Sequence, residues 1–211
     1  MTAKLITSAA EIGAARWNAL ANPERLAEPH PFTTYEFFAA VEESGSATRD
    51  TGWQPAHLLS GDALMPMYLK SHSYGEYVFD HGWAEALERA GGDYYPKLQA
   101  CVPFTPVTGR RVLASSDAAR DTLLKTAAAA ARQIAASSLH ITFLEEDEWK
   151  LAGEAGLLLR QDLQFHWKNN GYATFDDFLT SLSSSHRKTI RRERRLAAEG
   201  LIHDKSLIDE A

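Results

Sequence analysis

Residues 53–70 read WQPAHLLSGDALMPMYLK, and they predict the strands at the centre of the fold. Largely apolar runs flank Ser60-Gly61-Asp62, and a short polar stretch with glycine between such runs is typical of a tight turn. The sequence therefore predicts strands over residues 53–59 and 64–70, joined as a hairpin. A third strand is predicted over residues 74–80, where aromatic residues recur.

Helix signals surround this hairpin. Ser8-x-x-Glu11 and Thr33-x-x-Glu36 are capping boxes, in which a hydroxyl and a carboxylate satisfy the free backbone donors at a helix start. They predict helices over residues 9–20 and 34–44. The elements predicted downstream are a helix over 83–90, a strand over 97–104, a helix over 117–137, a strand over 139–144, a helix over 146–155 and a strand over 157–168. Strands that alternate with helices indicate an α/β or α+β fold.

The C-terminal part is predicted to be helical and basic. Thr174-x-x-Asp177 begins one helix, and the serines at 183–185 cap the next. Residues 186–195, HRKTIRRERR, hold six Lys or Arg and one Glu, whereas the net charge of the chain is -6. The rest of the chain is therefore acidic, and this helix is a local surface that attracts anions.

Five basic residues of this helix form two adjacent stripes at helical spacing. Arg187, Arg191 and Arg195 form one stripe, and Lys188 and Arg192 form the other. Because such stripes can engage successive phosphates, one hypothesis is a non-catalytic binding module that docks on RNA, tRNA or an anionic lipid surface. The alternative is a solvated helix face that pairs with the acidic body or with a further C-terminal lobe. The C-terminal helix could also associate with a second copy of the chain.

Polar groups crowd the segment that follows the hairpin. Its candidate catalytic residues are His72, Tyr74, Glu76, Asp80 and His81. If residues 74–80 form a strand, Glu76 and Asp80 point to the same side. A carboxylate or imidazole can remove a proton and a tyrosine can donate one, so the segment predicts a small-molecule site. The competing interpretation is that these side chains hold a loop by bonding to its backbone.

Two other candidates are weak. His72 and His81 lie nine residues apart without a further spaced ligand, so we expect no metal site. Cys101 is the only cysteine, which excludes an internal disulfide. Because it lies in the apolar run LQACVPF, we expect a buried structural thiol and not a nucleophile.

Three stretches of the chain resemble one known family. SHSYGEYVFD at 71–80, YYPKLQACVPFTPVTG at 94–109 and SSSHRKTIRRERR at 183–195 are similar to the FemAB-like bacterial N-acyltransferases of peptidoglycan biosynthesis, which are built from GNAT-type lobes. The resemblance covers residues 28–200. It implies a GNAT-like mixed sheet flanked by helices. It also implies one acyltransferase lobe over residues 1–172 and the helical start of a second lobe over 173–211, because the family is about twice this length.

The resemblance further implies transfer of an acyl or aminoacyl group to an amine acceptor, a small molecule or a peptide such as a peptidoglycan precursor. The donor would be acyl-CoA or aminoacyl-tRNA. Tyr95 and Lys97 would line the acceptor cleft. The phosphate-binding loop of acetyl-CoA enzymes is absent, and Gly109, Arg110 and Arg111 are its nearest substitute, unless they form a surface turn with solvated arginines.

The sequence also indicates where such a protein would act. The first 17 residues lack the apolar core of a secretory signal. No window approaches the roughly 18 uncharged apolar residues of a membrane span. We therefore expect a cytoplasmic protein that meets cell-wall material from the cytoplasmic side.

Overall fold

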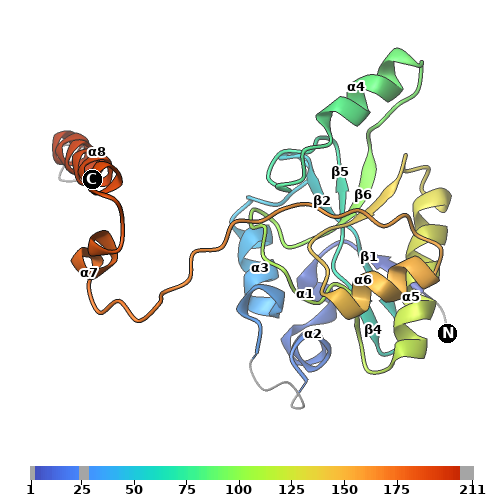
Figure 1. Cartoon of the computed structure of the whole chain (residues 1–211). Helices are drawn as coiled ribbons and strands as arrows, with labels where there is room; N and C mark the ends of the chain where they lie inside the picture. Colours follow the sequence, from blue (N-terminus) through green and yellow to red (C-terminus); the bar gives the residue numbers. More distant parts are fainter. Residues whose placement is uncertain (1–2, 24–28, 205–211) are drawn as a thin grey trace. The chain divides into compact units, whose positions relative to one another are not determined.

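The predicted hairpin is present, and it links two sheets. In this computed structural model, which describes residues 3–23 and 29–204, the turn at Gly61 joins β3, His57–Ser60, to β4, Ala63–Met65 (Figure 1). Gly61 has φ +58°, a conformation that glycine adopts without steric cost. Further from the turn, β2, Trp53–Pro55, pairs with β5, Tyr68–Lys70.

Each predicted hairpin strand therefore divides into two. The two ladders are connected by one backbone hydrogen bond from Ala56 N to Met67 O, 2.9 Å long. Pro66 lies between β4 and β5 and has no N–H to donate, so the ladder cannot continue unchanged through it. The hairpin changes sheet at this point, which corrects the prediction of two uninterrupted strands.

The first sheet has the strand order β1-β3-β4-β7, with all neighbours antiparallel. Its outer strands are β1, Lys4–Ile6, and β7, Leu113–Ala114. The second sheet has the order β2-β5-β6-β8, in which β6, Lys97–Ala100, is parallel to β8, Leu139–Ile141. Two sheets with helices around them make an α+β fold, as predicted.

The helices of the same region are α1, Ala9–Ile12; α2, Ala14–Ala21; α3, Tyr35–Glu43; α4, His81–Arg89; α5, Asp117–Gln133; and α6, Glu146–Glu154, with a 3-10 turn at Pro31–Thr33. The helix predicted over 9–20 is broken at Gly13, where φ is +81°. Thr34, and not Thr33, caps α3, because its side chain accepts a hydrogen bond from Phe37 N.

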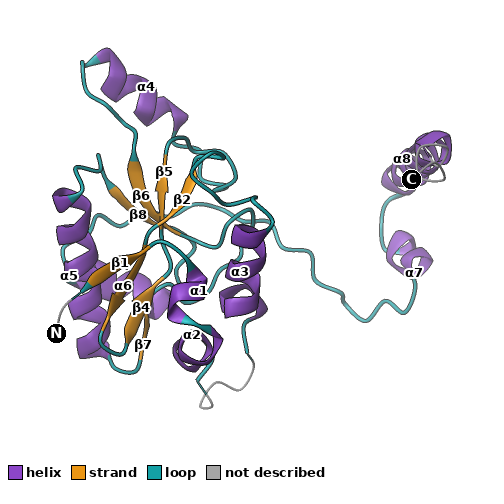
Figure 2. Cartoon of the chain, turned by 180° about the vertical axis from the view of Figure 1, so that it is seen from behind, coloured by secondary structure: helices purple, strands orange, loops and turns teal. Residues whose placement is uncertain are grey.

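Two predicted strands are wrong. Residues 74–80 form a loop (Figure 2), because Gly75 and Tyr77 have φ values of +79° and +56°, which no strand tolerates. Residues 157–168 join no sheet in the described part of the chain, although apolar and polar residues alternate over 162–168. The strand predicted over 97–104 ends at Ala100, three residues before Pro103.

The two faces of the second sheet are both buried at β6, but one is apolar and the other is polar. Leu98 and Ala100 lie in one apolar cluster with Leu123 and Ala127 of α5. Their neighbours along β6, Lys97 and Gln99, are equally buried but polar, and they point to the opposite side. A buried polar face on a sheet is unusual, and it positions the candidate site.

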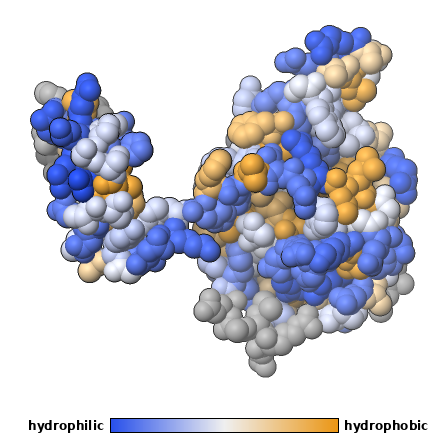
Figure 3. All heavy atoms as spheres, viewed as in Figure 1, coloured by the Kyte–Doolittle hydropathy of each residue, from blue (hydrophilic) through white to orange (hydrophobic). Residues whose placement is uncertain are grey.

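The chain divides into two units, Met1–Arg160 and Gln161–Ala211. In the second unit, α7, Phe175–Thr180, begins with the predicted capping box of Thr174 and Asp177. Phe178 packs against the rings of Trp167, Tyr172 and Phe175. The predicted basic helix is α8, Ser184–Asp204, which carries mainly hydrophilic residues (Figure 3). No helix in the described ranges is long and apolar enough to cross a membrane.

A buried glutamate holds α6 to the body. Glu148 is inaccessible to solvent and accepts hydrogen bonds from the backbone N of Arg111, at 2.6 Å, and of Val112, at 3.3 Å. Burial raises the pKa of Glu148 from 4.5 to about 7, despite these hydrogen bonds. The folded protein therefore binds this proton at pH values where the unfolded chain has released it.

This difference predicts how stability depends on pH. Because the pKa of Glu148 is raised on folding, its contribution is fully present below pH 4.5 and is lost as the pH rises towards 7. The loss amounts to about 3 kcal/mol in the free energy of unfolding. Urea denaturation across this window should show a clearly flatter profile for Glu148→Gln. Glu146→Gln, an exposed change on the same helix, should keep the slope of the parent, and an unchanged slope in Glu148→Gln would contradict the assignment.

Candidate active site

The candidate site is the buried polar face of the second sheet. Strand register places Lys70 of β5 directly opposite Lys97 of β6, and Tyr68 opposite Gln99. On the other side of β6, Gln99 is aligned with His140 of β8. Lys70 and Lys97 are both fully buried. Two ammonium groups on adjacent strands need negative partners, and the loop at 71–80 supplies them.

Lys97 lies at the centre of this cluster. Its Nζ donates to Ser73 Oγ at 2.9 Å, to Glu76 Oε2 at 2.7 Å and to Asp80 Oδ2 at 2.5 Å. These contacts use all three N–H donors of the ammonium group. One lysine on a strand thus fixes three residues of the loop, and both carboxylates are buried beside it.

Lys70 is held more loosely. Its Nζ lies 3.8 Å from Glu76 Oε1 and donates to Tyr74 O at 3.3 Å. It also lies 3.3 Å from the ring centroid of Trp53, in a cation–π contact. Burial lowers the pKa of Lys70 to about 7, an effect that the charge of Glu76 only partly offsets. This amine can therefore change its charge near neutral pH.

The two carboxylates have different environments. Burial raises the pKa of Glu76 above 4.5, although Lys97 opposes the shift. Burial acts on Asp80 in the same direction, but hydrogen bonds from Lys97, Ser73 and Tyr94 outweigh it and lower the pKa of Asp80 to about 2. Tyr94 Oη donates to Asp80 Oδ2 at 2.8 Å. Two neighbouring carboxyl groups whose pKa values move apart are suited to different roles in proton transfer.

Each carboxylate keeps one oxygen without a hydrogen-bond partner. Glu76 Oε1 and Asp80 Oδ1 are both buried and unbonded among the described residues. A buried acceptor left unpaired costs free energy, so such atoms are uncommon in a core and call for an explanation. For Glu76 Oε1, a proton donor on a bound molecule would supply the missing partner.

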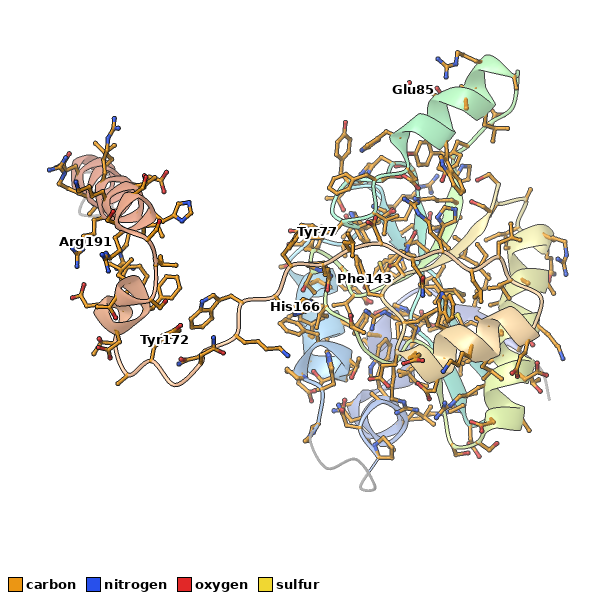
Figure 4. All side chains as sticks on the ribbon, in the orientation of Figure 1. Tyr77, Glu85, Phe143, His166, Tyr172 and Arg191 are labelled. Atoms are coloured by element: carbon orange, nitrogen blue, oxygen red, sulfur yellow. The ribbon has the colours of Figure 1, made fainter. Side chains whose placement is uncertain are left out.

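The backbone around the site is strained. Tyr77, in the loop after β5 (Figure 4), and Phe104, after β6, are non-glycine residues with φ values of +56° and +61°. Phe104 N donates to Gly75 O at 3.1 Å, which fixes the two segments together. A Cβ at Gly75 would lie 2.9 Å from the Phe104 ring and 3.0 Å from that of Trp53. Strain of this kind concentrates at functional sites.

Of the three other predicted catalytic residues, only His72 touches the cluster with its side chain, because its Nδ1 lies 3.4 Å from Lys70 Nζ. His72 Nδ1 accepts from Tyr74 N at 3.1 Å, and its Nε2 lies 2.9 Å from Thr51 O. Both ring nitrogens therefore bond to the loop backbone, which matches the structural interpretation of this histidine. Tyr74 and His81 are exposed, with ring centroids 5.7 Å apart.

The residues predicted to line the cleft do reach the cluster. Lys97 is its centre, and Tyr95 Oη lies 2.8 Å from Ser73 Oγ. Tyr94, one of the tyrosines that the sequence offers as proton donors, also lies in the cluster. Lys70, Ser73 and His140 were not predicted. His140 Nδ1 lies 3.9 Å from Asp80 Oδ2, and burial together with the charge of Lys97 lowers its pKa to about 4. One signal was available for Lys70: a lysine within an apolar strand needs a buried partner.

The predicted phosphate site is not formed by exposed arginines. Arg110 donates to the carbonyl oxygens of Leu20, Ala21 and Ala114. Arg111 donates to those of Thr142, Arg110 and Val107. Both guanidinium groups are buried and hold neighbouring segments together. Gly109 donates its N–H to Phe143 O at 3.0 Å, so this turn is structural as well.

The basic stripes of α8 differ in their contacts. Arg187 donates to Thr180 O at 3.2 Å, Arg191 lies 3.4 Å from Asp176 Oδ1, and Arg195 lies 3.7 Å from Glu199 Oε1. Lys188 and Arg192, the second stripe, are exposed. The second stripe is thus the better placed of the two to meet an anion.

Two remaining candidates can be placed. Cys101 is buried, as predicted, and burial raises its pKa to about 12, so the thiol is a poor nucleophile at neutral pH. Within residues 3–23 and 29–204, no group of three or more His, Cys, Asp or Glu is arranged to hold a metal ion.

The chain matches one protein family over most of its length. The profile of the FemAB-like family, described as peptidoglycan biosynthesis/recognition, matches residues 8–207. Searches of curated proteins and of solved structures returned no significant match. The family match includes the loop at 71–80 and strand β6, which together build the buried cluster.

Proposed function

Because the chain belongs to the FemAB-like family of peptidoglycan biosynthesis and recognition, we propose that it transfers an acyl or aminoacyl group to an amine of a peptidoglycan precursor. Such a reaction needs a base that takes a proton from the attacking amine and a donor that stabilises the tetrahedral oxyanion. Both kinds of group are present in the cluster around Lys97.

The proposal rests on the contacts of the two carboxylate oxygens of Glu76. One carboxylate oxygen is fixed by Lys97 at 2.7 Å, and the other is buried with no hydrogen-bond partner. The carboxylate is thus held in one orientation, and its second oxygen, which has only the 3.8 Å ion-pair contact with Lys70, can accept a substrate proton. Burial raises its pKa, which makes it a better base than an ordinary glutamate.

The other residues take supporting roles in this proposal. Asp80, whose pKa is low, stays ionised and positions Lys97 and Tyr94. Tyr95 is partly exposed and bonded to Ser73, so its hydroxyl is the group that can reach a substrate oxyanion. Because Glu76 is buried, the acceptor amine reaches it when side chains that cover the carboxylate move aside, while Lys97 keeps Glu76 in place.

In the proposed reaction, the acyl group moves from an oxygen or sulfur atom of the donor to the nitrogen of the acceptor amine. The amine nitrogen attacks the donor carbonyl carbon, and Glu76 Oε1 takes the proton that the nitrogen loses. The tetrahedral intermediate then collapses to the amide. The C–O bond of an aminoacyl ester or the C–S bond of a thioester breaks, and the leaving oxygen or sulfur receives the proton from Glu76.

A product assay tests the proposal. The purified chain is incubated with a soluble peptidoglycan precursor and, in separate reactions, with aminoacyl-tRNA or acyl-CoA, and the precursor is analysed by mass spectrometry. The proposal expects the mass to increase by one acyl or aminoacyl group with one of the donors. Binding of the precursor without a mass increase from either donor would contradict transfer and favour recognition alone.

Both candidate donors carry phosphates, and we assign their recognition to α8. Lys188 and Arg192 are exposed one helical turn apart, a spacing that suits successive phosphates. The first stripe contributes less, because its arginines already contact Thr180, Asp176 and Glu199.

This assignment predicts the salt dependence of tRNA binding. Lys188→Gln with Arg192→Gln should weaken binding and reduce the slope of log affinity against log salt by about 2, since each lost phosphate contact removes about 1. Glu193→Gln on the same helix is the control and should not weaken binding. Filter binding across a salt series measures the slope, and an identical slope for the double variant would exclude these two residues.

A further inference from the structure

Residues 161–168, QDLQFHWK, have the side-chain pattern of a strand without a strand partner. Leu163, Phe165 and Trp167 alternate with polar residues, and their side chains are 84%, 99% and 64% exposed. Three large apolar side chains at alternate positions share one face of an extended chain. Leu163 and Phe165 are the more exposed, because the Trp167 ring also packs against Phe178, with centroids 5.8 Å apart. In this unit, α7 and α8 are helices, and the described residues provide no strand beside this segment.

Local contacts support an extended conformation. His166 Nε2 lies 2.9 Å from Gln164 Oε1, so side chains two residues apart meet on the polar face. His166 lies on the extended segment that leads to α7 (Figure 4). An amphipathic segment in this state offers backbone donors and acceptors to another strand.

We propose that residues 161–168 pair antiparallel with the same residues of a second copy of this chain, with Phe165 on the two-fold axis. In this register Asp162 faces Lys168, so each end of the pair has one negative and one positive side chain. Leu163 faces Trp167, and Phe165 faces Phe165. Opposite charges and aromatic pairs across strands stabilise a two-stranded ladder, and a two-fold axis uses the same surface of both copies.

Other registers are less complementary. A parallel, in-register pair sets Asp162 against Asp162 and Lys168 against Lys168, which repels at both ends. Shifting the antiparallel pair by two residues in one direction sets Arg160 against Lys168. A shift in the other direction sets Leu163 against Asn169. Of these alignments, only the register centred on Phe165 pairs every apolar residue with an apolar residue and Asp162 with a lysine.

A charge swap tests both the association and its register. Light scattering on a dilution series of the full chain should show a dimer that dissociates on dilution. Asp162→Lys alone and Lys168→Asp alone should each shift the equilibrium to monomer, because each creates a like-charge pair. The double variant, Asp162→Lys with Lys168→Asp, should restore the dimer. A monomer at every concentration of the parent chain would overturn the proposal, as would a double variant that stays monomeric.

Cross-linking locates the axis and excludes the basic helix as the contact. Phe165→Cys should form a disulfide-linked dimer on oxidation, whereas Gln164→Cys should do so much more slowly, because it faces His166. The native Cys101 is buried and does not compete. Leu196→Glu, on the exposed side of α8, should leave the dimer intact. Equal cross-linking at 164 and 165, or loss of the dimer in Leu196→Glu alone, would contradict the strand pairing.

Discussion

Replacing Glu76 by glutamine should lower the rate of acyl transfer by about 10²- to 10⁴-fold, the range that a positioned general base contributes. Glutamine keeps the size of the side chain and an oxygen that can accept the 2.7 Å hydrogen bond from Lys97. It cannot take a proton from the attacking amine. The loss should therefore appear in kcat, and it is measured by quantifying the acylated precursor over time.

A matched variant separates chemistry from folding. Glu85→Gln removes an exposed carboxylate of α4 (Figure 4), which lies in none of the contacts around Lys97, and it should keep the parental rate. Both variants are also examined by thermal denaturation. Parental turnover in Glu76→Gln would return Glu76 to a structural role, in which it only neutralises Lys97.

The largest effect on stability is expected for Lys97→Met. This change leaves Glu76 and Asp80 buried without their shared positive partner, and removing one member of a buried ion pair costs about 3–5 kcal/mol. Urea denaturation should show this loss in the free energy of unfolding. Lys125→Met is the control, since Lys125 pairs with Asp121 on the surface of α5 and such pairs contribute about 0–1 kcal/mol.

Neutralising the carboxylates tests the cause of that loss. If uncompensated charge is responsible, Lys97→Met combined with Glu76→Gln and Asp80→Asn should be more stable than Lys97→Met alone. The three changes should therefore be non-additive, as expected for residues in one network. A triple variant less stable than Lys97→Met would show that packing, and not charge, sets the role of Lys97.

Local signals predicted the local structure well. The turn at 60–62 and the capping box at Thr174 are present because each depends on residues a few positions apart. The division of the hairpin between two sheets was not predicted, although Pro66 marks the place. Which sheet each half of the hairpin joins depends on pairing with strands far away in the sequence. The alternation of side chains within one strand does not predict that pairing.

The same distinction explains the site. The sequence predicted that Glu76 and Asp80 would lie together, but by the alternation of a strand; they meet because both bond to Lys97, more than fifteen positions away. Lys70 carried one signal, its position within an apolar strand, but only the strand register shows that it lies opposite Lys97. Arg110 and Arg111 looked like surface residues, and only the packing of Leu20, Ala21 and Thr142 around them shows otherwise.

The pH dependence of kcat/KM in the parent chain and in Glu76→Gln shows whether Glu76 is the base in acyl transfer. In the parent chain, kcat/KM should rise with pH as Glu76 loses its proton, with an apparent pKa above 4.5 because burial raises it. In Glu76→Gln, kcat/KM should be much lower and should not rise with pH in this way. A rise centred near pH 7 that persists in Glu76→Gln would instead follow Lys70, whose pKa is about 7, and would show that Glu76 is not the base.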